Sequence, residues 1–337
     1  MPEIKQKQKI KMRPIQEYQI LFKEYLAKNA FSQQPKELYE PVNYILSIGG
    51  KRLRPLLALM GCELFSDKIE RALPAAMAVE IFHNFSLLHD DIMDAAPLRR
   101  GQPTVHTKYN VNTGILSGDV MLIWAYRFLM NTEGGLENQM RLIHIFNKMA
   151  TEVCEGQQMD MNFETRDNVT IPEYIRMIEF KTSVLIAAAF QMGALIGGGT
   201  EEDAEHLYEF GRHIGIAFQI QDDILDSFGD PLKFGKKVGG DIIQNKKTIL
   251  VLKAFELANE TQEFELQGFM SSTDVEETLK IEAVKKLFET TGARRFAELE
   301  MENYLKIAFA NLDATPLSME KKNYMRQFAN DLMMREH

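Results

Sequence analysis

Residues 81–94 read IFHNFSLLHDDIMD, and residues 214–226 read IGIAFQIQDDILD. In each segment an apolar run ends in aspartates spaced four residues apart. These are Asp90 and Asp94 in the first segment, and Asp222 and Asp226 in the second. Side chains at i and i+4 share one face of a helix, and like charges at that spacing destabilise the helix. The pattern therefore predicts a bound cation that neutralises the carboxylates.

The oxygen ligands indicate which cation this is. Carboxylates select hard cations, and Mg²⁺ is typically held by one or two carboxylates plus substrate phosphates. We expect a magnesium–diphosphate site with two acidic walls, in which Asp91 and Asp223 accompany the spaced aspartates. His89 beside Asp90 would also suit a metal phosphohydrolase, but that class needs further histidine and aspartate ligands, and the seven histidines of this chain are scattered.

Composition narrows the class of protein. The chain has 337 residues, 45% of them hydrophobic, which is enough for a large core. A net charge of −9 disfavours nucleic acid as a partner. Cys62 and Cys154 have no metal-binding or redox spacing and indicate a reduced, cytoplasmic protein. Residues 1–13 are rich in Lys and Gln and lack an apolar core, so we expect a flexible tail rather than a secretory signal.

Helical periodicity dominates the chain, and strand-like alternation is almost absent. The segments expected to be helical are 14–29, 37–47, 53–65, 70–92, 112–130, 135–162, 172–196, 202–226, 246–258, 274–290, 292–312 and 316–334. Helix-start signals stand at Thr170 and Thr200, and the glycines 197–199 suit a helix end. Since no long linker divides the chain, we expect one all-α domain over residues 1–337.

The longest apolar run extends from Val184 to Ile196. Its 13 residues are fewer than the roughly 20 that a membrane span needs. We therefore expect a buried core helix and no transmembrane segment.

Two basic clusters could bind an anion near the first acidic motif. Arg99 and Arg100 follow Asp94 by five and six residues, and guanidinium groups bind phosphate through two parallel hydrogen bonds. Lys51 and Arg54 follow two glycines and would project together from a helical turn, whereas Arg52 would point elsewhere. Solvated surface cations remain the alternative for both clusters.

Further candidates lie along the helices and in one loop. Lys181 stands in an apolar helix, where it could bind phosphate or extend its charge to the solvent. His83 lies two helical turns before Asp90, and a satisfied core histidine is the alternative. The segment 234–247 combines glycines with lysines, which suits closure over a phosphate. It lacks the Walker signature, so a nucleotide P-loop is excluded.

Taken in chain order, these motifs resemble those of the trans-isoprenyl diphosphate synthases, the polyprenyl synthetase family that includes geranylgeranyl and farnesyl diphosphate synthases. The matching segments are Gly49–Pro55, His89–Asp94 with Arg99–Gly101, Lys181–Thr182, Gln219–Asp226 and Gly235–Lys236. The resemblance implies the isoprenoid synthase fold, a helical bundle around a deep central cavity. It also implies a homodimer that uses three Mg²⁺ ions to join isopentenyl diphosphate head-to-tail to an allylic diphosphate through an allylic carbocation.

The resemblance also assigns roles to residues. Magnesium would be bound by Asp90, Asp91 and Asp94, and by Asp222, Asp223 and Asp226. The allylic diphosphate would contact Arg99, Lys181, Gln219, Lys236 and Lys246. Isopentenyl diphosphate would contact Lys51, Arg54, His83 and Arg100, with Thr182 at the reacting centre. Two positions depart from the family pattern, since Lys237 stands where many relatives have proline and Asn245 stands where many bacterial relatives have glycine.

Product length depends on the residues that precede the first motif. Phe85 and Phe82 lie five and eight residues before Asp90, where aromatic side chains limit elongation in this family. The short acidic motif together with Phe85 favours a twenty-carbon product, geranylgeranyl diphosphate. Farnesyl diphosphate is the first alternative and a longer product the second.

Three other interpretations compete with a synthase. A class I terpene cyclase would share the fold, but it usually has a different second motif and lacks the pocket of Lys51, Arg54 and His83. A non-catalytic subunit that modulates a partner synthase tends to lose its acidic motifs, and this chain keeps both. A purely structural helical protein would not explain so many charged residues at motif positions.

Overall fold

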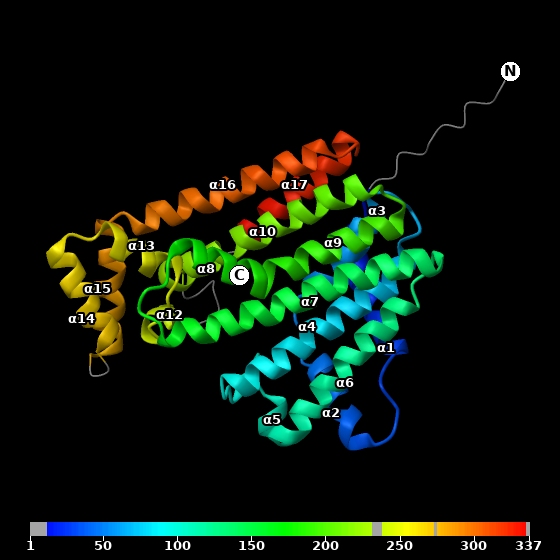
Figure 1. Ribbon diagram of the computed structural model, residues 1–337, viewed down its shortest axis with the longest axis horizontal. Helices are drawn as coiled ribbons and strands as arrows, with labels where there is room; N and C mark the ends of the chain where they lie inside the picture. Colours follow the sequence, from blue (N-terminus) through cyan, green and yellow to red (C-terminus); the bar gives the residue numbers. More distant parts are fainter. Residues whose placement is uncertain (1–11, 231–237, 273–274, 335–337) are drawn as a thin grey trace. The chain divides into compact units, whose positions relative to one another are not determined.

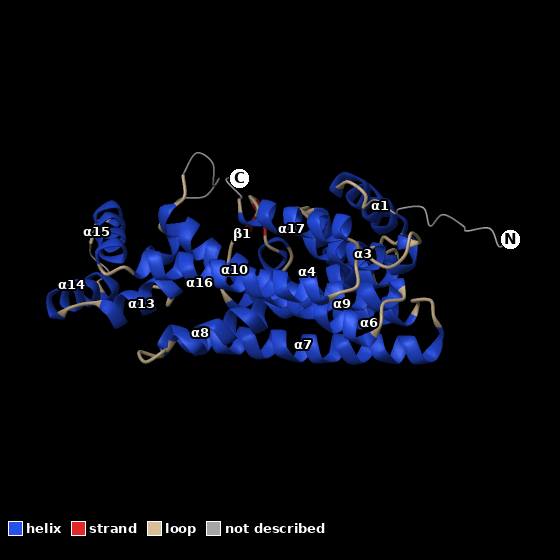
Figure 2. Cartoon of the chain, turned by 90° about the horizontal axis from the view of Figure 1, so that it is seen from above, coloured by secondary structure: helices blue, strands red, loops and turns tan. Residues whose placement is uncertain are grey.

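The computed structural model describes residues 12–230, 238–272 and 275–334. The described residues form helices apart from short connections and one two-stranded hairpin (Figures 1 and 2). The predicted all-α class is confirmed.

The first half of the chain contains seven α-helices, a 3₁₀ turn and the hairpin among the described residues. Its elements are α1 (Ile15–Lys28), α2 (Lys36–Ser47), α3 (Leu53–Glu63), the 3₁₀ turn η1 (Ile69–Ala72), α4 (Leu73–Met93), β1 (Leu98–Arg99), β2 (Gln102–Pro103), α5 (Val105–Lys108), α6 (Val111–Met130) and α7 (Gly135–Thr165).

The second half begins with a long apolar helix that contains a π-turn. Its elements are α8 (Ile171–Ile178), the π-turn η2 (Glu179–Ser183), α9 (Val184–Gly197), α10 (Glu201–Phe228), α12 (Gly240–Ile243), α13 (Ile249–Leu257), α14 (Glu260–Ser271), α15 (Glu277–Thr290), α16 (Ala293–Ala314) and α17 (Met319–Met333).

Contacts divide the chain into two compact units. Unit 1 comprises Met1–Lys148, Ala188–Tyr208 and Pro316–Lys321, and unit 2 comprises Met149–Ala187, Glu209–Thr315 and Lys322–His337. The helices α7, α9 and α10 each contribute residues to both units. The single domain expected from the sequence stays a prediction.

In unit 1 the core forms around α4, which packs along α6 (Figure 1). Two glycines of α6 allow this close approach, because a Cβ atom on Gly114 would lie 2.9 Å from the Cδ1 atom of Ile92, and one on Gly118 would lie 2.6 Å from the Cδ2 atom of His89. The second half of α4, which carries the first acidic motif, is thereby fixed against α6.

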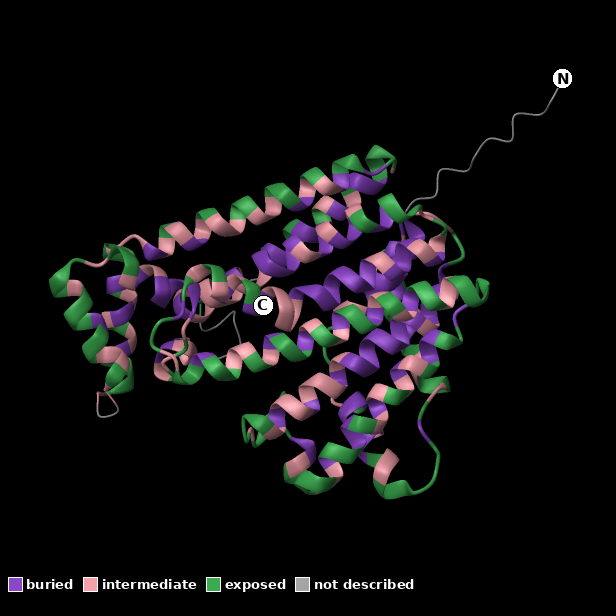
Figure 3. Cartoon of the chain, viewed as in Figure 1, coloured by how far each residue is buried: buried purple, intermediate pink, exposed green. Residues whose placement is uncertain are grey.

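The apolar run Val184–Ile196 proves to be part of a longer helix. Residues Ile171–Gly197 form one continuous helix of 27 residues, long and apolar enough to cross a membrane by length and composition alone. The apolar run of 13 residues is thus the C-terminal part of this helix, whose bounds agree with the predicted helical segment 172–196. Its most apolar stretch is 67% buried within the protein, as the colouring of α9 illustrates (Figure 3), so the expected core helix is confirmed.

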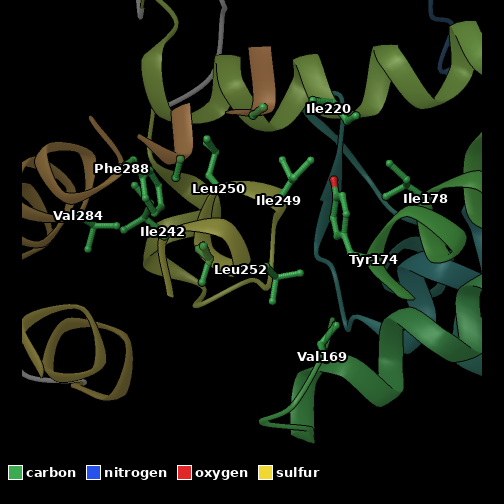
Figure 4. Packing of buried hydrophobic residues seen from close by; sticks show 14 of the residues in the cluster. Val169, Tyr174, Ile178, Ile220, Ile242, Ile249, Leu250, Leu252, Val284 and Phe288 are labelled. Atoms are coloured by element: carbon green, nitrogen blue, oxygen red, sulfur yellow. The ribbon is translucent and has the colours of Figure 1, made fainter. Parts of the chain in front are cut away.

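In unit 2 a second core gathers side chains from α8, α10, α13 and α15 (Figure 4). Ile178, Ile220 and Ile249 lie around the ring of Tyr174, which is 2% exposed. This packing fixes α8 against the half of α10 that carries the second acidic motif.

Most of the predicted helices and start signals are confirmed. The Thr170 hydroxyl accepts a hydrogen bond from the Glu173 amide in a capping box, and Thr200 forms the same reciprocal pair with Asp203. Helix α14 is not among the predicted segments, although Asn259 and Gln262 form a capping box at its start. Nor are α5, α12 and the β1–β2 hairpin, because all three are too short for a periodic pattern.

The expected N-terminal tail needs a correction at its end. Met12 is buried, and the guanidinium of Arg13 donates to the buried carboxylate of Glu63 in α3. Both residues are therefore packed against the protein. Met12 buries its apolar side chain, and Arg13 pairs its charge with Glu63. Residues 1–11 lie outside the described residues.

Candidate active site

The first acidic motif lies at the C-terminal end of α4. Asp90 and Asp91 belong to its last turn, and Asp94 is the capping residue, whose amide donates to the Asp90 carbonyl at 2.9 Å. A helix C-terminus carries partial negative charge, so carboxylates here are repelled by the helix as well as by one another. The end of α4 therefore requires positive charge nearby.

Arg99 supplies part of that charge. Its Nε and Nη2 atoms each donate to one oxygen of Asp91 at 2.8 Å, and Nη2 lies 3.8 Å from an Asp90 oxygen. Asp91 is buried, so this paired geometry is a strong, directional contact. Asp91 was expected to support a metal ion; in the structure both of its oxygens orient Arg99.

The β1–β2 hairpin determines how the two arginines are presented. Arg100 and Gly101 occupy its turn with φ angles of 52° and 75°, the left-handed pair that a tight two-residue hairpin requires. The Arg100 guanidinium donates to the Gly49 carbonyl and covers Gly50, where a Cβ atom would lie 2.6 Å from its central carbon. The glycines before Lys51 therefore make room for Arg100.

The expected geometry around Lys51 needs a correction. Helix α3 begins at Leu53, and Arg52 before it has a left-handed φ of 49°. Lys51 therefore precedes the helix, and the helical spacing argued for Lys51 and Arg54 was wrong. Arg52 points elsewhere, as expected, because it pairs with the buried Glu80 carboxylate.

A cluster of positive charge surrounds His83. Nη1 of Arg54 lies 3.1 Å from Nε2 of His83, in hydrogen-bonding contact. Burial and the charges of neighbouring arginines lower the pKa of His83 well below its ordinary value. These arginines are Arg54, Arg100, Arg99 and Arg52. A neutral imidazole accepts a hydrogen bond from Arg54, so His83 fixes that guanidinium without adding charge.

Aromatic rings extend from the acidic motif into the core of unit 1. The Phe85 ring lies 4.8 Å from the His89 ring and 5.5 Å from the Phe82 ring, measured between centroids. Phe82 has no exposed surface and meets Phe146 of α7 edge-on at 5.3 Å. Both expected length-determining residues thus belong to one aromatic stack, and Phe146, which the sequence analysis missed, supports it.

In unit 2 Lys181 and Thr182 lie in the π-turn η2. The Lys181 ammonium contacts an Asp160 oxygen at 2.5 Å, so it forms an ion pair rather than extending into solvent. A helical sequence pattern does not reveal a π-turn, and Asp160 lies in another helix, so this pairing is not visible in the sequence. Turns of this type occur frequently at functional sites.

Within the second acidic motif, Asp223 and Asp226 hold neighbouring segments. One Asp223 oxygen accepts from the Tyr174 hydroxyl at 2.5 Å and from the Ile249 amide at 3.3 Å. Figure 4 shows the Tyr174 hydroxyl pointing toward the helix of Ile220, which is α10. Burial raises the pKa of Asp223 to about 8. Asp226 accepts from the Asp241 amide at 2.9 Å.

The remaining candidates are distributed around α10 and α12. Gln219 is half-buried on α10, one turn before Asp223. Lys246 lies 3.3 Å from Asp241, a carboxylate the sequence analysis missed. Asn245 has a left-handed φ of 54°, a conformation that asparagine and glycine both tolerate. Lys236 and Lys237 lie outside the described residues.

The donor chemistry fits magnesium delivered with a diphosphate. Among the described residues, no group of three or more His, Cys, Asp or Glu side chains forms a metal site by itself. Each acidic motif instead offers carboxylates near a helix end. Mg²⁺ is typically bound by one or two carboxylates when substrate phosphates complete its coordination shell.

Comparison with known proteins agrees with this chemistry. Residues 35–289 match the polyprenyl synthetase family. The chain is 39% identical over 305 residues to a geranylgeranyl pyrophosphate synthase of Geoglobus acetivorans, which covers 90% of this chain and 93% of that protein. It is 36% identical over 317 residues to a geranylfarnesyl diphosphate synthase of Natronomonas pharaonis, which covers 89% of each. The chain belongs to the polyprenyl synthetase family.

Solved structures support the same assignment. A crystal structure of a geranylgeranyl pyrophosphate synthase superposes with a TM-score of 0.91 at 46% identity, and the match covers 97% of this chain and all 100% of that one. Another, from Corynebacterium glutamicum, contains isoprenyl diphosphate and magnesium, with a TM-score of 0.80, 28% identity, and coverage of 95% of this chain and 98% of that one. The fold is therefore the isoprenoid synthase fold, and the chain is a prenyltransferase of this family.

The pKa of His83 gives a direct test of the positive cluster. We expect the folded ring to stay neutral as the pH falls through about 6.5, the ordinary histidine value. Below that pH the unfolded chain takes up a proton that the folded ring does not, so His83 lowers folding stability as the solution becomes acidic. Ring-nitrogen NMR should show no titration there, and Arg54→Met should move the midpoint upward. An ordinary midpoint in the unaltered protein would contradict the cluster.

Proposed function

We propose that this prenyltransferase is a short-chain isoprenyl diphosphate synthase that condenses isopentenyl diphosphate with an allylic diphosphate and releases geranylgeranyl diphosphate. The observation that carries the proposal is the end of α4, where the aspartates of the first motif lie beside Arg99 and near the Arg54–His83 pair. Such a combination suits a metal-bound diphosphate together with a second, metal-free one.

The roles of the charged residues follow from this substrate pair. Asp90, Asp94 and Asp222 would hold three magnesium ions, and Arg99, Lys181, Gln219, Lys236 and Lys246 would contact the allylic diphosphate. Lys51, Arg54, His83 and Arg100 bind isopentenyl diphosphate. Asp91, Asp223 and Asp226 act mainly by fixing the helix ends, through Arg99, Tyr174 and the Asp241 amide respectively.

The reaction begins when the allylic C1–O bond breaks and its electron pair leaves with the diphosphate. Magnesium held by the aspartates of the two motifs would offset the charge that develops on this leaving group. Arg99 and Lys181 add fixed positive charge, already oriented by Asp91 and Asp160, so little reorganisation is needed. Thr182 beside Lys181 contributes a hydroxyl at the reacting carbon.

Bond formation uses the second substrate. The isopentenyl double bond attacks the allylic carbon, a new C–C bond forms, and a proton leaves from the neighbouring carbon to the departed diphosphate. Arg54 and Arg100 hold the isopentenyl diphosphate, which keeps its own C–O bond. The products are one longer allylic diphosphate and one inorganic diphosphate.

A homodimer is proposed from the outer face of α6. Leu116 and Ile123 are 60% and 59% exposed, and Ile115 and Met130 on the same helix are exposed as well. Burying such a row against a second copy would remove it from water. Sedimentation of the purified protein as a monomer would contradict this assembly.

Purified protein should be incubated with Mg²⁺, labelled isopentenyl diphosphate and each allylic primer in turn, with product length read by mass spectrometry. We expect a twenty-carbon diphosphate, and an Asp222→Asn variant should lose most of the turnover. A fifteen- or twenty-five-carbon product would contradict the proposed product length but would still support the proposed condensation reaction. A folded protein that elongates no primer would contradict the synthase and favour the non-catalytic subunit.

Product length should respond to the aromatic stack. Phe82→Ala removes the ring between Phe85 and Phe146, and we expect the same assay to give products longer than those of the unaltered enzyme. Phe128→Ala on α6 is the control, because Phe128 is also buried but its ring contacts Trp124, which is not part of the stack. Equal product lengths in all three proteins would exclude Phe82 as a length determinant.

A further inference from the structure

The π-turn that carries Lys181 and Thr182 interrupts an otherwise regular helix between Ile171 and Gly197. Well under 1% of residues in globular proteins adopt this geometry, because an α-helix normally forms better hydrogen bonds. The extra residue in the turn changes the direction in which Lys181 points relative to a continuous α-helix. Some interaction must therefore maintain the turn.

Two glycines make room for the π-turn but do not keep it in its conformation. A Cβ atom on Gly156 of α7 would lie 2.7 Å from the Phe180 carbonyl carbon, and one on Gly215 of α10 would lie 2.7 Å from the Ser183 Cα atom. Both distances are shorter than real Cβ contacts. The backbone of the turn thus packs directly on the backbones of α7 and α10.

Two ion pairs connect the turn to the same two helices. Lys181 pairs with Asp160 of α7 at 2.5 Å, as described above. Glu179, the first residue of the turn, accepts from Nη1 of Arg212 in α10 at 3.1 Å. Both side chains of this second pair are largely shielded from water, with exposed fractions of 25% for Arg212 and 21% for Glu179.

Arg212 is itself fixed within α10. Its Nε and Nη2 atoms donate to the Glu209 carboxylate one turn earlier, at 3.1 Å and 2.6 Å. Arg212 precedes Asp222 by ten residues, which is about 15 Å along a helix. It therefore belongs to the helix of the second acidic motif but lies too far along it to contact a diphosphate bound there.

We propose that Arg212 is a positioning residue, which acts through Glu179 to keep the π-turn in the geometry that aims Lys181 and Thr182 at the allylic diphosphate. The inference rests on the proposed function. Through the Arg212–Glu179 pair, the direction of Lys181 depends on α10, the helix that also carries the second acidic motif.

Loss of Arg212 has a specific electrostatic consequence. The Glu179 carboxylate would then be left partly buried without its main cation, which is unfavourable. Glu179 and Lys181 stand two residues apart and point to different helices, α10 and α7, so the carboxylate does not take the place of Asp160. The loss instead frees the turn from α10, so that its backbone and Lys181 with it move away from the substrate.

The test compares three variants of the full-length protein. Arg212→Met and Glu179→Gln each remove the ion pair, whereas Glu209→Gln removes the charge of the other carboxylate bound to Arg212 and leaves the Glu179 pair intact. We expect the first two to lower kcat about 10- to 100-fold, the scale of a misplaced catalytic group, with an unchanged KM for isopentenyl diphosphate. Binding of inorganic diphosphate with Mg²⁺, measured by calorimetry, should weaken in the same two variants. Glu209→Gln should leave both quantities within about twofold.

Other outcomes would overturn the inference. One is a lower melting temperature in Arg212→Met with unchanged kcat and diphosphate binding, which would make the pair structural only. Another is an equal loss in Glu209→Gln. Arg212→Lys should restore part of the kcat, since it keeps the charge. If the unaltered protein binds diphosphate but makes no product, the proposed function fails, and the comparison of diphosphate binding still decides the role of Arg212.

Discussion

Carboxylates gathered at a helix C-terminus repel one another and the helix end, and both acidic motifs depend on how that repulsion is offset. In each motif the middle aspartate is held by hydrogen-bond donors of the protein. Asp91 accepts two hydrogen bonds from Arg99, and Asp223 accepts from the Tyr174 hydroxyl and the Ile249 amide. One carboxylate of each motif thus fixes the helix end, which keeps its neighbours at the spacing that a magnesium-bound diphosphate needs.

The positive charge is positioned by backbone conformations that few residues adopt. Arg52 and Arg100 both have left-handed φ angles, and Gly50 has a φ of 118°. These turns place the guanidinium of Arg100 over the glycine backbone and bring that of Arg52 to Glu80. The neutral His83 then orients Arg54. Local strain at these positions is therefore compensated by contacts that shape an anion site.

A helical apolar periodicity that continues over many residues is compatible with few other structures. The sequence therefore predicts the helices well, and the fold class follows from them. Features set by contacts between distant residues are not visible in a single pattern. The pairing of Lys181 with Asp160 and the π-turn depend on packing between helices, and the pairing of Asp91 with Arg99 depends on a two-residue turn. The family resemblance identifies the motif residues, but only the structure shows which carboxylates anchor the helix ends.

The most direct measurement is thermal unfolding with and without Mg²⁺ and inorganic diphosphate, for the unaltered protein, Asp90→Asn and Asp91→Asn. A ligand at a hundred times its Kd stabilises the folded state by about 2.7 kcal/mol. The account predicts that Asp90→Asn loses most of this ligand-induced stabilisation, whereas Asp91→Asn lowers the melting temperature already without ligand. An unchanged ligand effect in Asp90→Asn would contradict the view that repelling carboxylates are gathered here to bind magnesium.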